Sequence, residues 1–236
     1  MTSNNRFVTS RRDFRARAHS NPLNDAEFLV PQDPRCFDWS PFIPGIGTTS
    51  RIDYVDLGCG YGGLLLELSK VFPDKFMLGL EIRDRVASYC TTKVEELRRL
   101  YPGEYRNIGF LRTNCMKFLP FYFPKASVDK FFIGFPDPHF KKKKHRQRLV
   151  SLRFLSEAAY CLQPGGMIYI VTDVEELFEW MNLKFSRHPL FSAMDKDQVE
   201  QQDILISYLL NHTDEAQRVQ RRGPNTKYWN VYRRLQ

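Results

Sequence analysis

Residues 52–63 read Ile52-Asp53-Tyr54-Val55-Asp56-Leu57-Gly58-Cys59-Gly60-Tyr61-Gly62-Gly63, a short apolar run followed at once by glycines. The run from Ile52 to Leu57 has the length and apolar content of a buried parallel strand. Leu64 to Phe72 then carries apolar residues at helical spacing until Pro73-Asp74 stops it. Small residues between a strand and a helix let backbone N–H groups approach a ligand closely. The stretch therefore predicts a ligand-binding loop in an α/β fold.

Short strands and helices continue to alternate on the C-terminal side of this loop. Predicted strands cover residues 76–80, 108–111, 128–135, 167–171 and 229–233, and predicted helices cover residues 85–100, 148–161 and 174–185. This order, with few hairpin signals, indicates a doubly wound, mostly parallel sheet whose last strand is antiparallel. Residues 1–50 lack such periodicity and are predicted to form a basic N-terminal arm on a domain of residues 51–236.

The glycines alone leave the cofactor class open. Gly58, Gly60 and Gly63 match the G-x-G-x-x-G pattern that also binds nicotinamide and flavin dinucleotides. Asp56 separates the classes, because a carboxylate at the strand end would repel a pyrophosphate but can pair with the ammonium of a methionine moiety. Glu81, at the tip of the second strand, can accept ribose hydroxyls from either cofactor. The set favours S-adenosylmethionine and resembles class I methyltransferases, whose Rossmann-like seven-stranded sheet ends in an antiparallel strand.

The charge of the chain favours an anionic partner. Among 236 residues, 35 Lys and Arg stand against 27 Asp and Glu, which gives a formal net charge of +8. The excess lies in three clusters rather than evenly along the chain, and such clusters are typical of nucleic-acid-binding proteins. The clusters are Arg6, Arg11, Arg12, Arg15 and Arg17; Lys141, Lys142, Lys143, Lys144, Arg146 and Arg148; and Arg218, Arg221 and Arg222.

Several functional classes are not expected. No apolar run approaches the roughly 20 residues that span a bilayer, and the polar N-terminus does not resemble a signal peptide, so we expect a cytoplasmic or nuclear protein with no membrane contact. The five cysteines lack C-x-x-C spacing, so neither a disulfide framework nor a metal site is expected.

The segment Phe132-Ile133-Gly134-Phe135-Pro136-Asp137-Pro138-His139-Phe140 is the most informative about the substrate. It follows a predicted strand, at the sheet edge where ligands of open α/β sheets bind. Two prolines flank Asp137 and restrict the backbone that carries its carboxylate. The lysine run that follows at once predicts a polyanion-binding surface beside the methyl-transfer centre, formed by Lys141, Lys142, Lys143, Lys144 and Arg146. His139 and His145 flank these lysines and are interpreted as surface imidazoles.

This segment resembles the Pro-Asp-Pro signature of tRNA (guanine-N7)-methyltransferases. Further similar stretches cover most of residues 15–235, and the first of them is most like the catalytic subunit of the eukaryotic type. They are Arg17-Ala18-His19-Ser20-Asn21-Pro22, the glycine loop, Leu78-Gly79-Leu80-Glu81-Ile82-Arg83, Gly165-Gly166 and Thr172-Asp173.

The resemblance implies positions for the functional residues. The cofactor contacts fall on Gly58, Glu81, Ile82, Arg83, Asn114, Cys115 and Gly134, where the family usually has a larger side chain than Gly134. The family's C-terminal Thr-Glu-Glu element falls on Thr213-Asp214-Glu215, with Asp214 replacing the middle Glu. The catalytic aspartate falls on Asp137. The implied substrate is a guanosine in the tRNA variable loop, the implied partner is a non-catalytic WD-repeat β-propeller, and the implied location is the nucleus, with the cytoplasm as a second location.

The chemistry of guanine N7 constrains the role of Asp137. N7 carries a lone pair and no proton, so its attack on a sulfonium methyl requires no general base. Asp137 is therefore expected to accept hydrogen bonds from the guanine N1–H and N2–H2 edge and to favour the positive charge that develops on the ring.

Other readings of the sequence stay open at this point. They are a class I methyltransferase acting on another RNA, a protein or a metabolite; a non-catalytic RNA-binding subunit of the same fold; and a nicotinamide-dependent oxidoreductase, which Asp56 disfavours.

Overall fold

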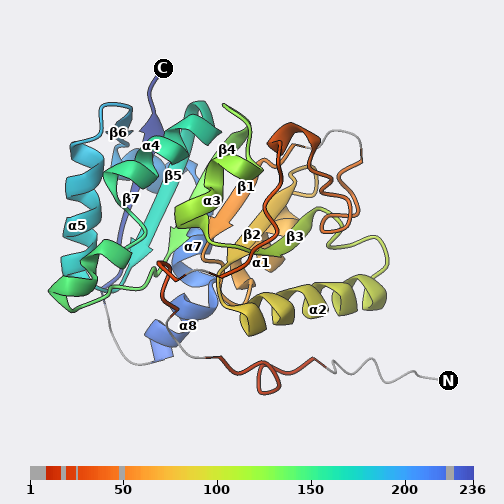
Figure 1. The fold of residues 1–236 in the computed structure, drawn as a ribbon. Coiled ribbons are helices and arrows are strands. Elements are labelled where there is room, and N and C mark those ends of the chain that lie inside the picture. The colour runs from red at the N-terminus through yellow and green to blue at the C-terminus, as the bar shows by residue number, and fades with distance from the viewer. Residues whose placement is uncertain (1–8, 17–19, 25, 48–50, 222–225) are drawn as a thin grey trace.

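The computed structural model describes residues 9–16, 20–24, 26–47, 51–221 and 226–236, and these form one sheet with helices on both faces (Figure 1). The strands lie in the order β3-β2-β1-β4-β5-β7-β6, and β1 to β5 are parallel while β7 runs antiparallel to both β5 and β6. The predicted mostly parallel, seven-stranded sheet is therefore confirmed. The strands are β1 Tyr54–Leu57, β2 Met77–Glu81, β3 Ile108–Arg112, β4 Val128–Gly134, β5 Leu162–Thr172, β6 Phe191–Ala193 and β7 Tyr228–Arg234.

Helices cover the two faces of the sheet because successive strand residues point to opposite sides. In β1, Val55 and Leu57 belong to the core beneath α3, α4 and α5, and Tyr54 belongs to the core beneath α1, α2, α6 and α7. This is the doubly wound arrangement that the alternating elements predict. The helices are α1 Gly63–Val71, α2 Asp84–Leu100, α3 Cys115–Tyr122, α4 Leu152–Cys161, α5 Glu175–Ser186, α6 Lys196–Gln202, α7 Ile204–Asn211 and α8 Asp214–Arg221, with 3-10 turns η1 Pro34–Cys36 and η2 Lys142–Gln147.

Two element boundaries differ from the prediction by more than two residues. Helix α4 begins at Leu152 rather than Arg148, because the Ser151 side chain accepts the N–H of Phe154 and caps the helix there. Strand β5 begins at Leu162 rather than Met167, because the Pro164-Gly165-Gly166 stretch forms an irregularity inside the strand instead of ending before it.

Five of the strands and α-helices were not predicted from the sequence: α3, β6, α6, α7 and α8. Helix α3 contains Pro120, which interrupts its apolar pattern, and it begins where Asn114 accepts the N–H of Met116. The C-terminal region beyond residue 186 holds β6, α6, α7 and α8 before the predicted last strand. Helices α6, α7 and α8 have only seven or eight residues each, too few turns for an apolar pattern to identify a helix.

The predicted arm contributes to the core of the domain. Trp39, Ile43 and Ile46 are buried among residues of α3 and the sheet, and the ring of Trp39 stacks on that of Phe123. Figure 1 shows the arm crossing in front of the sheet before the chain enters β1. The division at residue 50 stays a prediction, but the packing of residues 39–46 is that of the domain itself. In the described part of the chain, no helix is long and apolar enough to cross a membrane.

Candidate functional site

The carboxyl ends of β1, β2 and β4 and the turn after β3 enclose a cavity of about 470 Å³, here called the inner cavity. Such an opening between the ends of parallel strands is where open α/β sheets bind ligands. The structure brings most of the predicted cofactor residues together here, along with the predicted catalytic residue. Those that line the inner cavity are Gly58, Gly60, Glu81, Ile82, Arg83, Asn114, Cys115, Gly134, Asp137 and Glu215.

The glycine loop leaves room for a ligand above β1. Gly58 and Gly60 have φ angles of 82° and 55°, a left-handed backbone that glycine adopts without strain. A side chain at Gly58 would meet no atom within 4 Å, and one at Gly60 would lie 3.4 Å from the Glu215 carboxylate. The loop therefore forms an open wall of the inner cavity, with Glu215 facing it.

Four carboxyl groups gather around this loop. Asp56 is 5% exposed, and burial together with the nearby charges of Glu215 and Glu81 raises the pKa of its carboxyl to about 8. Burial and the adjacent Asp214 also raise the pKa of Glu215. Asp56, Thr213, Asp214 and Glu215 line a small space of about 10 Å³ beside the inner cavity. Burial and mutual repulsion make the ionised form of these carboxyl groups unfavourable, and a cationic ligand group would relieve both effects.

Three of these four carboxyl groups already have cationic partners, and the third pair, Glu215 with Arg218 at 3.5 Å, lies within α8. Both oxygens of Glu81 accept hydrogen bonds from Arg83, at 3.1 Å from Nε and 2.8 Å from a terminal guanidinium nitrogen. Asp214 forms an ion pair with Arg11 of the arm, whose guanidinium lies 4.7 Å from the centre of the Tyr61 ring. Thr213 accepts the N–H of Ala216 at 2.9 Å and so caps the start of α8.

The arm also crosses the inner cavity. Its residues Ala16, Ser20 and Pro22 line the wall, and the carbonyl of Pro22 accepts a hydrogen bond of 2.6 Å from the buried amide of Asn114. Cys115 follows Asn114, and burial raises the pKa of its thiol to about 12, so it is a neutral wall residue. Residues 1–8, 17–19 and 222–225 lie outside the described residues, including Arg6, Arg17 and Arg222 of the basic clusters and the first three residues of the Arg17–Pro22 stretch.

Asp137 lies on a strained turn after β4. Phe135 and His139, on either side of it, have φ angles of 51° and 45°, which L side chains adopt at a cost. The Asp137 carboxylate accepts the N–H of His139 at 3.3 Å and lies 3.6 Å from Nε2 of the same residue. The prediction of a surface imidazole at His139 is wrong, because only 8% of its side chain is exposed and it contacts Asp137.

The second histidine and one predicted surface cation are also packed inside the protein. Arg148 is 2% exposed, and its Nε donates a hydrogen bond of 2.8 Å to the carbonyl of Pro138, next to Asp137. Its guanidinium also pairs with Glu176 at 2.8 Å and lies 4.9 Å from the centre of the Trp180 ring, against which His145 also packs. Arg148 is thus not part of the polyanion-binding surface, and neither it nor His145 is a surface group.

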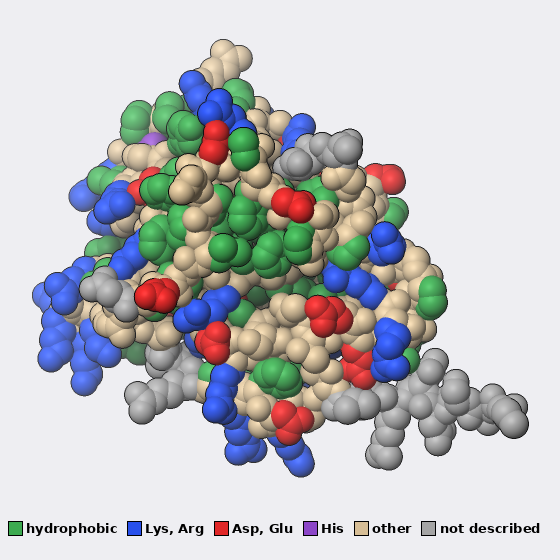
Figure 2. Space-filling model, turned by 45° about the vertical axis from the view of Figure 1, so that its right-hand side comes forward, with side chains coloured by type: hydrophobic (Ala, Val, Ile, Leu, Met, Phe, Trp, Pro, Cys, Tyr) green, Lys and Arg blue, Asp and Glu red, His purple; other side chains and the backbone are tan. Residues whose placement is uncertain are grey.

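The other cations of this cluster are exposed as predicted. Lys141, Lys142, Lys143, Lys144 and Arg146 lie on or beside η2 with their side chains in solvent. Lys141 and Lys144 line a second, larger opening of about 960 Å³, here called the outer cavity, which shares Asp137 and His139 with the inner cavity. Figure 2 shows Lys and Arg side chains gathered at the lower left and along the bottom of the molecule.

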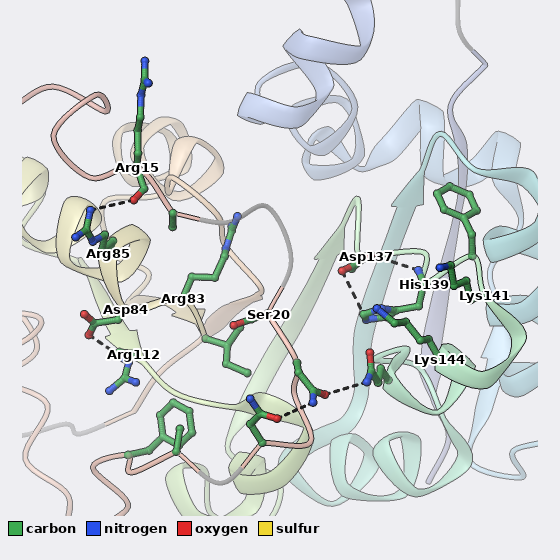
Figure 3. A pocket seen from close by; sticks show the side chains of 18 residues that line it. Arg15, Ser20, Arg83, Asp84, Arg85, Arg112, Asp137, His139, Lys141 and Lys144 are labelled. Atoms are coloured by element: carbon green, nitrogen blue, oxygen red, sulfur yellow. Dashed lines mark hydrogen bonds and ion pairs between the residues drawn. The ribbon is translucent and has the colours of Figure 1, made fainter.

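The outer cavity has cations on both of its walls. Figure 3 shows Asp137, His139, Lys141 and Lys144 on one side, and residues of the arm and of the β2–α2 region on the other. The cations of this opposite wall are Arg15, Arg83, Arg85 and Arg112. Arg112 is paired with Asp84 at 3.3 Å, and Arg85 donates to the carbonyl of Arg15 at 3.3 Å. A negatively charged chain that enters this cavity meets positive charge before it reaches Asp137.

Sequence reasoning missed Arg11 and Arg148 as structural parts of the site. Both were counted as surface charges, since a single sequence shows no sign of the partner that each one meets. The partners are Asp214 for Arg11 and Glu176 with Trp180 for Arg148, all far away along the chain. Among the described residues, no group of three or more His, Cys, Asp or Glu side chains is placed to hold a metal ion.

Comparison with known proteins places these features in context. A methyltransferase family model, described as "Putative methyltransferase", matches residues 50–228. A tRNA (guanine-N(7)-)-methyltransferase of Oryza sativa subsp. indica is 44% identical over 95% of this chain and 91% of its own length. The protein of the same name from Danio rerio is 44% identical over 97% of both chains.

A solved structure supports the fold alone. The crystal structure of a 16S rRNA methyltransferase, KamB, superposes with a TM-score of 0.53 at 14% identity, covering 79% of this chain and 90% of that one. The family match over residues 50–228 and the sheet order together give the fold of class I methyltransferases, as the glycine loop predicts.

Proposed function

We propose that this chain, which belongs to the tRNA (guanine-N7)-methyltransferase family, transfers a methyl group from S-adenosylmethionine to N7 of a guanosine in the tRNA variable loop, forming 7-methylguanosine. One observation carries the proposal. Asp137 lies where the inner cavity, built from strand-end cofactor residues, meets the outer cavity, lined with cations. A base that contacts Asp137 can therefore face a cofactor on one side while its RNA lies on the other.

The residues of the inner cavity fit S-adenosylmethionine. Its buried carboxyl cluster favours an ammonium group, and the raised pKa of Asp56 has the same electrostatic origin. Glu81, at the tip of β2, can accept ribose hydroxyls with the lone pairs that Arg83 leaves unused. Asn114 and Cys115, at the start of α3, line the same cavity, and we expect them to contact the adenine edge. The cofactor supplies a methyl group activated by its sulfonium.

Asp137 orients the base and does not remove a proton. Guanine N7 has no proton to lose, while its N1–H and N2–H2 edge offers two donors to a carboxylate. His139 contacts the same carboxylate through its backbone N–H and its ring, so the Asp137 side chain has a defined direction before the base arrives. The negative charge then stabilises the cationic ring of the product.

The tRNA is bound through its phosphates and shape. Lys141, Lys142, Lys143, Lys144 and Arg146 present positive charge beside the opening, and the arm adds Arg15 on the opposite wall. Phosphate contacts position a structured RNA without reading its sequence, and the target base must leave its stack to reach Asp137.

A partner and a cellular location complete the proposal. A non-catalytic WD-repeat β-propeller subunit would need a face that leaves both cavities open. Helices α3, α4 and α5 form such a face, and they expose the large apolar side chains of Phe121, Leu152, Tyr160 and Leu183.

The basic arm and the family resemblance support a nuclear location. Co-purification of the tagged chain with a propeller protein, and imaging of the tagged chain in its own cells, test these two points.

The experiment that tests the reaction is chemical mapping of 7-methylguanosine. Purified protein is incubated with S-adenosylmethionine and an unmodified tRNA transcript, and reductive strand cleavage then reports the methylated position. We expect cleavage at one guanosine of the variable loop. The matched control is the same tRNA with 7-deazaguanosine there, which lacks the accepting nitrogen and should give none. Methylation of protein or of a small molecule, with none in tRNA, would contradict the proposal.

Calorimetry separates this activity from a non-catalytic role of the same fold. A chain that serves only as an RNA-binding subunit would bind tRNA but not S-adenosylmethionine. We expect binding of both, since Glu81 lines the inner cavity and Asp56 lies beside it, as S-adenosylmethionine binding requires.

A further inference from the structure

Phe140 exposes an aromatic ring at the edge of the outer cavity. It is 69% exposed, more than any other large hydrophobic side chain in the described part of the molecule. The other phenylalanine of this cavity, Phe28, packs against the guanidinium of Arg112 at 5.0 Å and the ring of Phe118 at 5.8 Å. Within the described residues, no ring or cation packs on Phe140 in the same way. An isolated phenyl ring in water gains free energy when a flat apolar surface covers it.

The position of Phe140 relative to Asp137 indicates what that surface is. Asp137 and His139 line both cavities, while Phe140 lines only the outer one. The left-handed backbone of His139 turns the chain between Asp137 and Phe140. A base held at Asp137 faces the inner cavity, so the ring of Phe140 lies on the side from which the RNA chain enters. Lys141 and Lys144 lie on the same side and suit the phosphates of that chain.

We propose that Phe140 is a stacking platform for a nucleobase adjacent to the target guanosine. The inference rests on the proposed function, because it takes a flipped guanosine at Asp137 as given. A nucleotide that leaves its stack also exposes the face of its neighbour, and an aromatic side chain can replace the lost contact for any base. Phe140 thereby holds the RNA open while the target base occupies the site.

The first test compares three variants by tRNA binding and single-turnover methylation. Phe140→Ala should weaken tRNA binding about 5- to 100-fold, the range for loss of one base–aromatic stack. Phe140→Tyr should restore it, since tyrosine offers the same flat ring. The matched control is Tyr101→Ala, which removes a ring that is 43% exposed and lines neither cavity, and it should bind as wild type. The melting temperature of Phe140→Ala should not change, because its ring is in solvent.

A probe in the RNA distinguishes stacking from a general apolar contact. We would place 2-aminopurine in the tRNA beside the target guanosine, where stacking quenches its fluorescence. Wild type and Phe140→Tyr should quench it, and Phe140→Ala should not. An abasic nucleotide at this position should weaken binding to wild type by about the factor that Phe140→Ala causes, and the two changes together should add nothing further.

The outcomes of these tests are distinct. If the wild-type protein methylates tRNA and the Phe140→Ala variant binds tRNA as tightly as wild type does, the stacking role is overturned and the proposed function stays intact. Failure of Phe140→Tyr to restore binding, or additivity with the abasic nucleotide, would also overturn it. Absence of tRNA methylation by the wild-type protein would instead remove the proposed function on which the inference rests.

Discussion

The inner and outer cavities share Asp137 but are built in different ways. The inner cavity is formed by side chains at the ends of regular strands, and Glu81 in its wall and Asp56 beside it are almost fully buried. The outer cavity is formed by the arm, the turn after β4 and η2, and its lysines lie in solvent. Burial therefore sets the charge state of the carboxyl groups at the inner cavity. At the outer cavity, the exposed lysines act on an anionic ligand through long-range attraction that salt screens.

Replacing Asp137 tests a residue that lines both cavities. Asp137→Asn keeps the size of the side chain but turns an amide donor toward a base edge that is itself a donor. We expect the single-turnover rate at saturating tRNA to fall about 10²- to 10³-fold, comparable to the loss of one oriented charge-stabilising group. Affinity for S-adenosylmethionine should stay unchanged, since its residues are at the strand tips.

The control for this variant is another carboxylate of the same cavity. Asp84 lines the outer cavity and pairs with Arg112, but it does not reach the inner one. Asp84→Asn should retain the wild-type rate. If Asp137→Asn keeps most of its rate, Asp137 does not orient the base.

Arg148 and Arg146 test whether a buried cation near the Asp137 turn acts differently from an exposed one. The Arg148 guanidinium holds the carbonyl of Pro138, so Arg148→Met should release the turn that carries Asp137. We expect a rate loss of up to about 10²-fold through misplacement, and a free energy of unfolding lower by about 1–3 kcal/mol from unpaired polar groups. The exposed Arg146 is the matched control. Arg146→Met should weaken tRNA binding in a salt-dependent way and leave the rate at saturation unchanged. Equal behaviour of the two variants would show that Arg148 does not hold the turn that carries Asp137.

The inner cavity was largely predictable from the sequence. Asp56 and Glu81 lie at or next to the last residue of their strands, and parallel strands bring their ends to one edge, so the residue order was enough to place both side chains in the site. Asp137 was placed by the same reasoning, because its turn follows β4, the neighbour of β1 in the sheet. The cofactor roles of these residues remain predictions.

For the outer cavity, the sequence predicted the positive charge but not which cations are exposed. Lys141 and Arg148 stand in one run of cations without helical or strand period, yet the first is exposed and the second buried. What separates them is the 3-10 turn η2, which faces Arg148 toward Trp180 and Glu176 of α5. The path of the arm was equally hidden, since it depends on contacts such as that of Pro22 with Asn114.

The pH dependence of cofactor binding tests the burial of Asp56. With a pKa near 8, its carboxyl is mostly protonated at pH 6, and a cationic ligand must displace that proton. Binding therefore releases a proton below about pH 8, and affinity for S-adenosylmethionine should rise with pH, by about tenfold per unit from about pH 6 to pH 7. Above about pH 8 it should fall again, because the ligand's own α-amino group loses its charge. Calorimetry in buffers of different ionisation heat measures the proton release.

Asp56→Asn is the control for this linkage. It should bind the cofactor more weakly and with little dependence on pH below about pH 7.5, apart from the contribution of Glu215, whose pKa is also raised. A wild-type affinity that does not change from about pH 6 to pH 8 would show that Asp56 does not pair with the ligand's ammonium group.

The lysine run should give the smallest effects, and they should depend on salt rather than pH. An exposed charge contributes about 0.2–1 kcal/mol, so each single Lys→Gln substitution should weaken tRNA binding by no more than about fivefold. Each should also lower the slope of log affinity against log salt by roughly one. Lys142→Gln and Lys144→Gln form a matched pair, because Lys144 lines the outer cavity and Lys142 does not. Equal slopes for the pair mean that the run acts as one diffuse field along the RNA. Slopes equal to that of wild type in both variants would place the tRNA elsewhere on the protein.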